Sequence, residues 1–188
     1  MSDTSGEVRL GRAFFERDSP VVAPELLNKV LVVGECAGRI VEVEAYRSDD
    51  PASHTFRGRT ARNATMWGHG GHLYVYFTYG MHFCANVVTS IEGDGQAVLL
   101  RGAVPLRGLE FMRRRRGGRP DRILADGPGK LCQAFGLDRS DDGTDLVRDP
   151  AVTIVDDGIL PPMAPIVTPR IGIRVATDVP WRWVAPPA

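Results

Sequence analysis

Residues 38–46, GRIVEVEAY, alternate apolar and polar side chains and therefore predict a β-strand with two unlike faces. The two faces hold different residue types: Val41, Val43 and Ala45 against Glu42, Glu44 and Tyr46. A strand with one apolar face is stable only where a core covers that face. The chain is therefore expected to fold around a sheet.

Other segments predict the neighbours of this strand. Strands are expected at residues 30–34, 73–78, 84–91 and 96–104, and the IEGDGQ turn joins the last two as an antiparallel hairpin. Three short helices are expected: one with Pro24 in its first turn, one from Pro105 to Gly117, and one in DGPGKLCQAFGL that Gly136 ends. Short strands in VTIV, RIGIRV and PWRWV follow. The order predicts an α+β fold for residues 1–188, a single domain with a curved antiparallel β-sheet core and surrounding short helices.

Composition limits the class of protein. A length of 188 residues with 43% hydrophobic and 24% charged residues suits one globular domain. No apolar run approaches the roughly 20 residues of a membrane span, and the first residues lack the apolar centre of a signal peptide. Cys36, Cys84 and Cys132 form no CxxC pair, which favours reduced cysteines in a cytoplasmic protein.

The net charge of zero argues weakly against a nucleic-acid partner. The arginines, however, gather between Arg57 and Arg122, so a neutral total can hide one basic face. The run from Arg113 to Arg116 surrounds a helix, where it serves either as a solvated helix end or as part of such a face. Lys130, in DGPGK at a helix start, is a candidate phosphate contact.

Glu42 and Glu44 leave three chemical readings open. They could be a solvated strand face, an acid and base pair roughly 6–7 Å apart, or a site where one carboxylate activates water. No metal site is expected, because the pair His69 and His72 lacks convincingly spaced further ligands. No cofactor is expected either.

Three tyrosines crowd LYVYFTYG. Tyr74 and Tyr76 are predicted on one strand face, whereas Tyr79 directly precedes Gly80 in a turn that faces water. An exposed aromatic on a tight turn suits a wedge that enters a nucleic acid between base steps.

These motifs occur together, and in this order, in one family. GRIVEVEAYRSDDPASHTFRGRTARNATMW, HLYVYFTYGMHFCANVV, GDGQAVLLRGAVPLRGLEFMRRRR and DGPGKLCQAFGL make the chain resemble the alkyladenine (3-methyladenine) DNA glycosylases. The resemblance implies that Glu44 activates water, that Tyr46, His54 and Tyr76 enclose an extruded base, and that Asn86 lies on the pocket floor. It implies no cofactor.

The resemblance also implies residues that act on DNA. Arg101 would lie beside the catalytic water and a phosphate, and Tyr79 would intercalate where the nucleotide left the helix. Met81 and His82 lie beside that wedge, and Lys130 is expected at the same surface. The implied partner is duplex DNA with a damaged purine, bound by a monomer without membrane contact. One departure from the family is GHGGH before the tyrosine strand, where a proline-glycine turn is usual, so a looser start of that strand is expected.

The implied activity is release of alkylated or deaminated purines by hydrolysis of the N-glycosidic bond. With Lys29 and Lys130 as the only lysines, neither near Glu44, a monofunctional enzyme is expected. The alternative from the resemblance is a non-catalytic damaged-DNA-binding protein, which would need no Glu44. A carbohydrate hydrolase using Glu42 and Glu44 is a second alternative.

Overall fold

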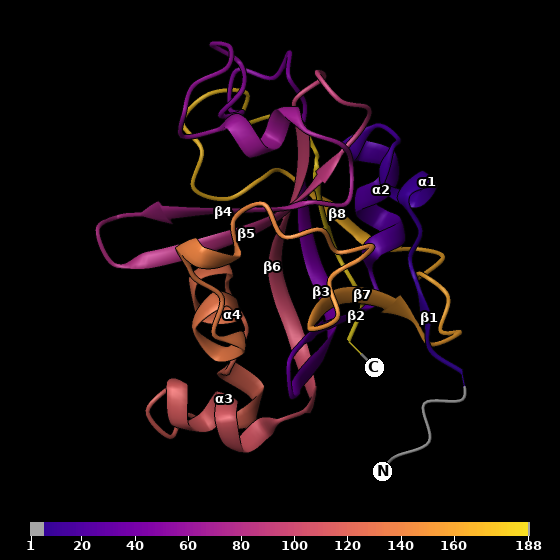
Figure 1. The fold of residues 1–188 in the computed structure, drawn as a ribbon, viewed down its shortest axis with the longest axis vertical. Coiled ribbons are helices and arrows are strands. Elements are labelled where there is room, and N and C mark those ends of the chain that lie inside the picture. Colours follow the sequence, from indigo (N-terminus) through magenta and orange to yellow (C-terminus); the bar gives the residue numbers. More distant parts are fainter. Residues whose placement is uncertain (1–5, 188) are drawn as a thin grey trace.

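In the computed structural model, which describes residues 6–187, nine strands form one curled antiparallel sheet (Figure 1). The strand order is β1-β7-β2-β3-β6-β5-β4. Strand β9 pairs with residues 42–44 of β3, beyond the part of β3 that pairs with β2, and β8 pairs with β9. The strands are β1 Val8–Arg9, β2 Val30–Val33, β3 Cys36–Tyr46, β4 Leu73–Thr78, β5 His82–Thr89, β6 Gln96–Arg107, β7 Val152–Asp156, β8 Ile166–Thr168 and β9 Arg182–Val184.

Short helices cover this sheet. They are α1 Arg12–Phe15, α2 Ser19–Leu26, α3 Leu109–Arg115 and α4 Pro128–Phe135, with the 3₁₀ turns η1 Ala64–Trp67, η2 Asp121–Ile123 and η3 Arg139–Asp141. Figure 1 shows α1 and α2 on one side of the long strands β3 and β6, and α3 and α4 on the other side, below the hairpin of β4 and β5. That hairpin projects sideways from the rest of the molecule.

The main core lies between the sheet and these helices. Its side chains come from every layer and are fully or almost fully buried: Phe15, Leu26, Leu31, Ile40, Val43, Leu73, Val98, Leu100, Met112, Leu131 and Phe135. Each fully buried side chain of this size stabilises the fold by about 1.5–3 kcal/mol. Helix α4 contributes Leu131 and Phe135 from one face and ends at Gly136, whose φ of 77° is left-handed. The terminator predicted at Gly136 is confirmed.

The antiparallel α+β architecture predicted from the alternation is confirmed. Hairpins join β4 to β5 and β5 to β6, and the second uses the predicted IEGDGQ turn. Predicted strands at residues 30–34, 73–78, 84–91 and 96–104 correspond to β2, β4, β5 and β6, and VTIV and PWRWV contain β7 and β9.

Two predicted helix starts are wrong, and both errors involve proline. Pro24 lies inside α2, because Pro20 takes the first turn and the helix ends two residues after Pro24. The helix predicted from Pro105 begins only at Leu109, because β6 continues through Pro105, which pairs with Gly38 on β3. Gly108 then turns the chain with a φ of 71°, at a point where a Cβ atom would lie 2.6 Å from the carbonyl oxygen of Glu35.

The strand predicted at RIGIRV is also wrong. Residues 170–175 form a loop, and the short strand of this region is β8, just before it. The amide of Ile171 donates to a carboxylate oxygen of Glu44 at 2.8 Å rather than to a neighbouring strand. The segment therefore belongs to the site described below and not to the sheet.

The GHGGH segment is tightly held, contrary to the looser strand start that its sequence predicted. Gly70 and Gly71 pass so close to Phe15 that a Cβ atom on either would lie 2.8 Å from it. Their amides donate to the carbonyl oxygens of Ser90 and Val88 at 3.1 and 2.7 Å. Only glycine fits this passage, and it fixes the start of β4.

Across residues 6–187 the helices are too short and too polar for a transmembrane segment.

Candidate active site

One row of residues crosses four strands and forms the floor of the site. The register places Glu44 of β3 opposite Leu99 of β6, Leu99 opposite Asn86 of β5, and Asn86 opposite Tyr74 of β4. Directly opposed residues of antiparallel strands point to the same face of the sheet. Residues far apart in the sequence therefore lie side by side because of strand pairing.

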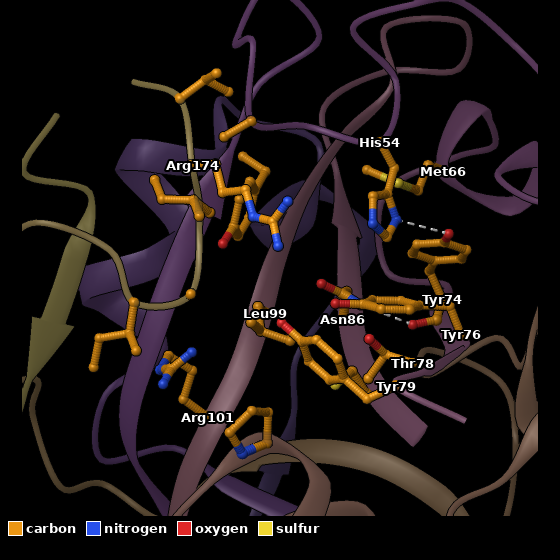
Figure 2. A pocket seen from close by; sticks show the side chains of 18 of the residues that line it. His54, Met66, Tyr74, Tyr76, Thr78, Tyr79, Asn86, Leu99, Arg101 and Arg174 are labelled. Carbon is orange, nitrogen blue, oxygen red and sulfur yellow. Dashed lines mark hydrogen bonds between the residues drawn. The ribbon is translucent and has the colours of Figure 1, made fainter. Parts of the chain in front are cut away.

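A cavity of about 530 Å³ opens over this floor (Figure 2). Its lining includes six residues named from the sequence: Tyr46, His54, Tyr76, Tyr79, Asn86 and Arg101. Figure 2 shows His54, Tyr74 and Tyr76 on one side of the cavity and Arg101 and the loop of Arg174 on the other. The volume lies within the range of about 300–1,000 Å³ that is usual for small-molecule sites.

The aromatic wall is rigid because its members contact one another. The rings of Tyr74 and Tyr76 stack with centroids 5.5 Å apart, and the His54 ring meets Tyr76 edge-on at 4.5 Å. A hydrogen bond of 3.1 Å joins Nδ1 of His54 to the Tyr74 hydroxyl. Burial, together with the charge of Arg62, lowers the pKa of His54, and burial raises the pKa of Tyr74 to about 12. The wall is thus held neutral, with a flat face toward the cavity.

Glu44 lies under this cavity with none of its side chain exposed. Its Oε1 accepts the Ile171 amide at 2.8 Å and lies 3.2 Å from Nη1 of Arg101. Its Oε2 accepts the Tyr46 hydroxyl at 2.7 Å. A buried carboxylate needs such donors and a cation, and Glu44 has both. The interpretation of Glu44 as part of a solvated strand face is therefore wrong.

Arg101 reaches the two glutamates from a β-bulge. The register passes from Glu42 opposite Gly102 to Val43 opposite Leu100, which leaves Arg101 without a partner on β3. Its Nε donates to Glu42 Oε1 at 2.7 Å, and Arg182 donates to the same oxygen at 2.7 Å. Burial opposes the charge of Arg101, but Glu44 and Glu42 outweigh it and raise its pKa.

Glu42 differs from Glu44 in its surroundings. Burial alone would raise its pKa, but the hydrogen bonds from Arg101 and Arg182 outweigh burial, and the pKa of Glu42 lies below its ordinary value. A general acid requires the opposite shift. Glu42 therefore does not have the electrostatics of a general acid.

The loop of residues 170–175 closes the cavity opposite the aromatic wall. Arg170 and Asp50 form an ion pair in which neither side chain is more than 2% exposed. The Arg170 guanidinium also lies 4.7 Å from the Tyr46 ring centroid and 5.4 Å from that of Trp181. This anchor keeps the loop against β3, where the Ile171 amide reaches Glu44.

Tyr79 occupies the tip of the β4–β5 hairpin. Both Tyr79 and Gly80 have positive φ values, 50° and 68°, and the Met81 amide donates back to the Thr78 carbonyl at 3.2 Å. A turn of this kind favours Asn or Gly, so a tyrosine at its first central position is strained. The tip also exposes large side chains, with Tyr79 at 80% and Met81 at 70%. The predicted exposure of Tyr79 is confirmed.

His82 lies next to the start of α4, the helix that contains Lys130. His82 follows the tip on β5 and packs against the first turn of α4, where a Cβ atom on Gly129 would lie 3.0 Å from its ring. Lys130, on that turn, forms an ion pair with Asp126 at 2.9 Å. The first turn of α4 therefore lies against the end of β5 that is next to the hairpin tip.

The arginine run on α3 is divided between structural contacts and solvent. Arg115 donates to the Ala134 carbonyl at 3.0 Å, and Arg116 donates to the Leu124 carbonyl at 3.0 Å. Arg113 pairs with Asp121 at 2.7 Å, and Arg114 lies over the Phe111 ring at 5.4 Å. Arg115 and Arg116 therefore hold α3 to residues 124–134, the segment that contains α4.

Residues 6–187 contain no group of three or more His, Cys, Asp or Glu side chains that could hold a metal ion. All three cysteines are free and buried. Cys84 lines the cavity, and burial raises the pKa of its thiol.

Sequence reasoning missed the residues that come from loops. Arg62 and the segment Ile171–Val175 line the cavity, and Figure 2 shows the Arg174 guanidinium pointing into it from that segment. The segment was assigned to a strand because Ile171, Ile173 and Val175 alternate with smaller or charged residues. Nothing in the sequence around Asp49 and Asp50 indicates that Asp50 pairs with Arg170, 120 residues later.

Comparison with known proteins gives a consistent picture. Residues 13–187 match the family model described as methylpurine-DNA glycosylase (MPG). A Burkholderia lata protein with the name of a 3-methyladenine DNA glycosylase is 55% identical over 181 residues, which cover 94% of this chain and 87% of the relative. Relatives of the same name from Methanoculleus marisnigri and Carboxydothermus hydrogenoformans are 48% and 43% identical, each over 93% of both chains.

Proposed function

The chain belongs to the methylpurine-DNA glycosylase family, and we propose that it removes alkylated and deaminated purines from duplex DNA. The substrate class is 3-methyladenine, 7-methylguanine, hypoxanthine and ethenoadenine. The damaged nucleotide turns out of the helix into the cavity, and water hydrolyses its N-glycosidic bond.

The observation that carries this proposal is the pairing of a wholly buried carboxylate with an aromatic cavity. Glu44 lies under the floor of a cavity of about 530 Å³, beside Arg101 and Tyr46. A base that is extruded from DNA needs a flat apolar pocket, and its sugar then needs a negative charge nearby.

The chemistry follows from the bond that breaks. An N-glycosidic bond opens through a state in which the sugar carries positive charge, which the Glu44 carboxylate stabilises. The same carboxylate accepts a proton from the water that attacks the sugar carbon. Arg101 lies 3.2 Å from Glu44 and lines the cavity, and its proposed second role is to contact the phosphate of the extruded nucleotide.

The aromatic wall suits damaged purines in particular. Alkylated purines such as 3-methyladenine carry a positive charge, and flat electron-rich rings attract such cations. Tyr46, His54 and Tyr76 line the space in which the base would stack, and the His54 and Tyr76 rings contact each other. Asn86 lines the same cavity, and its proposed role is to reject a normal guanine by a clash with the amino group of that base.

The hairpin tip serves the same reaction from outside the cavity. Tyr79 is strained at its turn and largely exposed, which fits a side chain that fills the gap left by the nucleotide. Met81, His82 and Lys130 lie beside this wedge and would contact the same duplex.

The proposed enzyme is monofunctional. A lyase step needs a free amine that attacks the sugar, and both lysines are in ion pairs. Lys29 binds Asp156 at 2.7 Å with 5% of its side chain exposed, and Lys130 binds Asp126. Trapping of a covalent adduct with DNA by borohydride would contradict this part of the proposal.

Single-turnover release of a free base is the test. Parent protein and Glu44→Gln are compared on duplexes with one 3-methyladenine or one hypoxanthine, with undamaged duplex as the control. Release by the parent and not by the variant supports the proposal. Tight binding of damaged DNA without release from any substrate would instead indicate the damaged-DNA-binding protein.

The structure weakens the carbohydrate-hydrolase alternative. Glu42 is bound by two arginines that lower its pKa, so it is a poor proton donor at neutral pH. Trp183 packs in the core rather than along a sugar platform.

A further inference from the structure

The two oxygens of Glu44 are unequally occupied. Oε1 faces two donors, the Ile171 amide and Arg101, at 2.8 and 3.2 Å. Oε2 faces one donor among residues 6–187, the Tyr46 hydroxyl, at 2.7 Å. Since each carboxylate oxygen accepts about two hydrogen bonds, Oε2 has one acceptor position that no side chain or amide among residues 6–187 fills.

We propose that Tyr46 is a positioning residue for Glu44, in addition to being a wall of the base pocket. Its hydroxyl fixes the rotation of the carboxylate, favours the ionised form, and makes Oε2 the oxygen that receives the proton of the attacking water. This inference rests on the proposed function, because it assigns a role within that same reaction.

The reaction step balances without a further reagent. The water oxygen bonds to the sugar carbon as the bond from that carbon to the purine nitrogen breaks, and the electron pair leaves with the base. The water proton passes to Oε2 of Glu44. Tyr46 keeps its own proton throughout, since burial and the charge of Glu44 raise its pKa far above neutrality.

The charges around Glu44 come from every element packed against it. Arg101 on β6 faces it directly, with Glu42 of β3 and Arg182 of β9 behind that guanidinium. Arg170 in the loop lies over the Tyr46 ring, while Tyr76 of β4 and Cys84 of β5 are neutral neighbours with raised pKa values. Among these groups only Tyr46 donates to Oε2.

A matched control exists in the same pocket. Tyr76 is another tyrosine of the wall, and its hydroxyl forms no hydrogen bond to Glu44, whose hydrogen-bond donors among residues 6–187 include Tyr46 and Ile171. Tyr46→Phe and Tyr76→Phe each remove one hydroxyl and keep one stacking ring. Only the first change touches the carboxylate.

The experiment measures single-turnover base release against pH. The substrate is a duplex with one 7-methylguanine, whose base is already cationic and needs no proton to leave, so the acidic limb of the profile reports the general base. Parent, Tyr46→Phe, Tyr76→Phe and Glu44→Gln proteins are compared, with binding of the same duplex and the thermal midpoint as checks of folding.

Tyr46→Phe removes the one hydrogen bond to Oε2 of Glu44 from residues 6–187, and a hydrogen bond to a carboxylate favours the ionised form. The acidic limb of Tyr46→Phe is expected to move up by about one pH unit, the equivalent of one charged hydrogen bond. The limb of Tyr76→Phe is expected to stay with the parent.

An acidic limb of Tyr46→Phe that coincides with the parent's, whatever the plateau rate, would overturn the positioning role. An equal movement in both variants would also overturn it, since the cause would then be the pocket as a whole. Failure of the proposed function looks different: the parent releases no base, or Glu44→Gln releases it as fast as the parent.

Discussion

At the scale of single residues, two glutamates two positions apart have different surroundings. Glu44 is wholly buried and contacts Tyr46 and Ile171, whereas Glu42 keeps 17% of its side chain exposed and contacts two arginines. Alternation placed both on one face, and the resemblance to a family singled out Glu44. Alternation alone could not distinguish the two glutamates, because the spacing of residues in a strand does not show which hydrogen-bond donors other elements bring to each carboxylate.

The two glutamates predict different kinetic losses. Glu44→Gln is expected to lower single-turnover release by about 10²–10⁴-fold, because it removes the proposed base. Glu42→Gln keeps an oxygen acceptor for Arg101 and is expected to cost no more than about tenfold. Rates are compared at saturating protein. Losses of equal size would favour a two-carboxylate mechanism.

The strained tip of the hairpin predicts that a change at Tyr79 weakens DNA binding without slowing the chemical step. Tyr79→Ala is expected to weaken binding of lesion-containing duplex by about 1–3 kcal/mol, the usual loss of one stacking contact. A fluorescent base analogue beside the lesion reports flipping, which should weaken in parallel. The rate at full saturation should change little, since Tyr79 does not contact Glu44.

Tyr79→Phe keeps the flat ring and serves as the control. If Tyr79→Ala bound, flipped and excised like the parent, the wedge role would be wrong.

At the scale of elements, the strands were predictable and their register was not. Period-two alternation and the turn between β5 and β6 located the strands, because those signals are local. The bulge at Arg101 depends on how β6 pairs with β3, which involves residues about sixty positions apart. The prolines misled for a similar reason: β6 continues through Pro105 because that residue pairs with Gly38 on β3, and no local feature shows this.

The arginine run predicts a stability difference between neighbours. Arg115→Ala is expected to lower the free energy of unfolding by about 1–2 kcal/mol, because the Ala134 carbonyl loses a charged donor. Arg114→Ala removes a contact with one exposed face of Phe111 and should stay within about 0.5 kcal/mol. Urea denaturation of both variants measures the difference, and equal stability would show that Arg115 does not join α3 to α4.

At the scale of the whole molecule, charged pairs connect distant parts of the chain. Asp145 binds Arg12, Asp156 binds Lys29, and Asp157 binds Arg39. The sequence shows a net charge of zero but not this pairing, because the partners are more than a hundred residues apart. Within the arginine-rich stretch from Arg57 to Arg122, Arg101 pairs with Glu42 and Arg113 pairs with Asp121, which reduces the basic face predicted there.

These pairs and His54 predict how stability depends on pH. The pKa values of Asp145, Asp156 and Asp157 lie below the ordinary 3.8, so their stabilisation is present above that pH and is lost as pH falls through the lowered values. The pKa of His54 lies below 6.5, so the unfolded chain binds its proton first and stability begins to fall below that pH.

Calorimetry from pH 8 to pH 3 is expected to show a constant thermal midpoint above about pH 7, a shallow decline below it and a steep decline near pH 4 and lower. His54→Gln should remove the shallow part alone. A midpoint that rises on acidification would contradict both assignments.

Residues near the C-terminus complete a site whose first residues are synthesised early. Asp50, Tyr46 and Glu44 leave the ribosome early, yet the partner of Asp50 is synthesised 120 residues later, together with the amide that binds Glu44. A nascent chain attached to the ribosome therefore lacks one wall of the pocket and one donor to its carboxylate. Synthesis itself therefore delays the assembly of the complete site until residues 170 and 171 have been made.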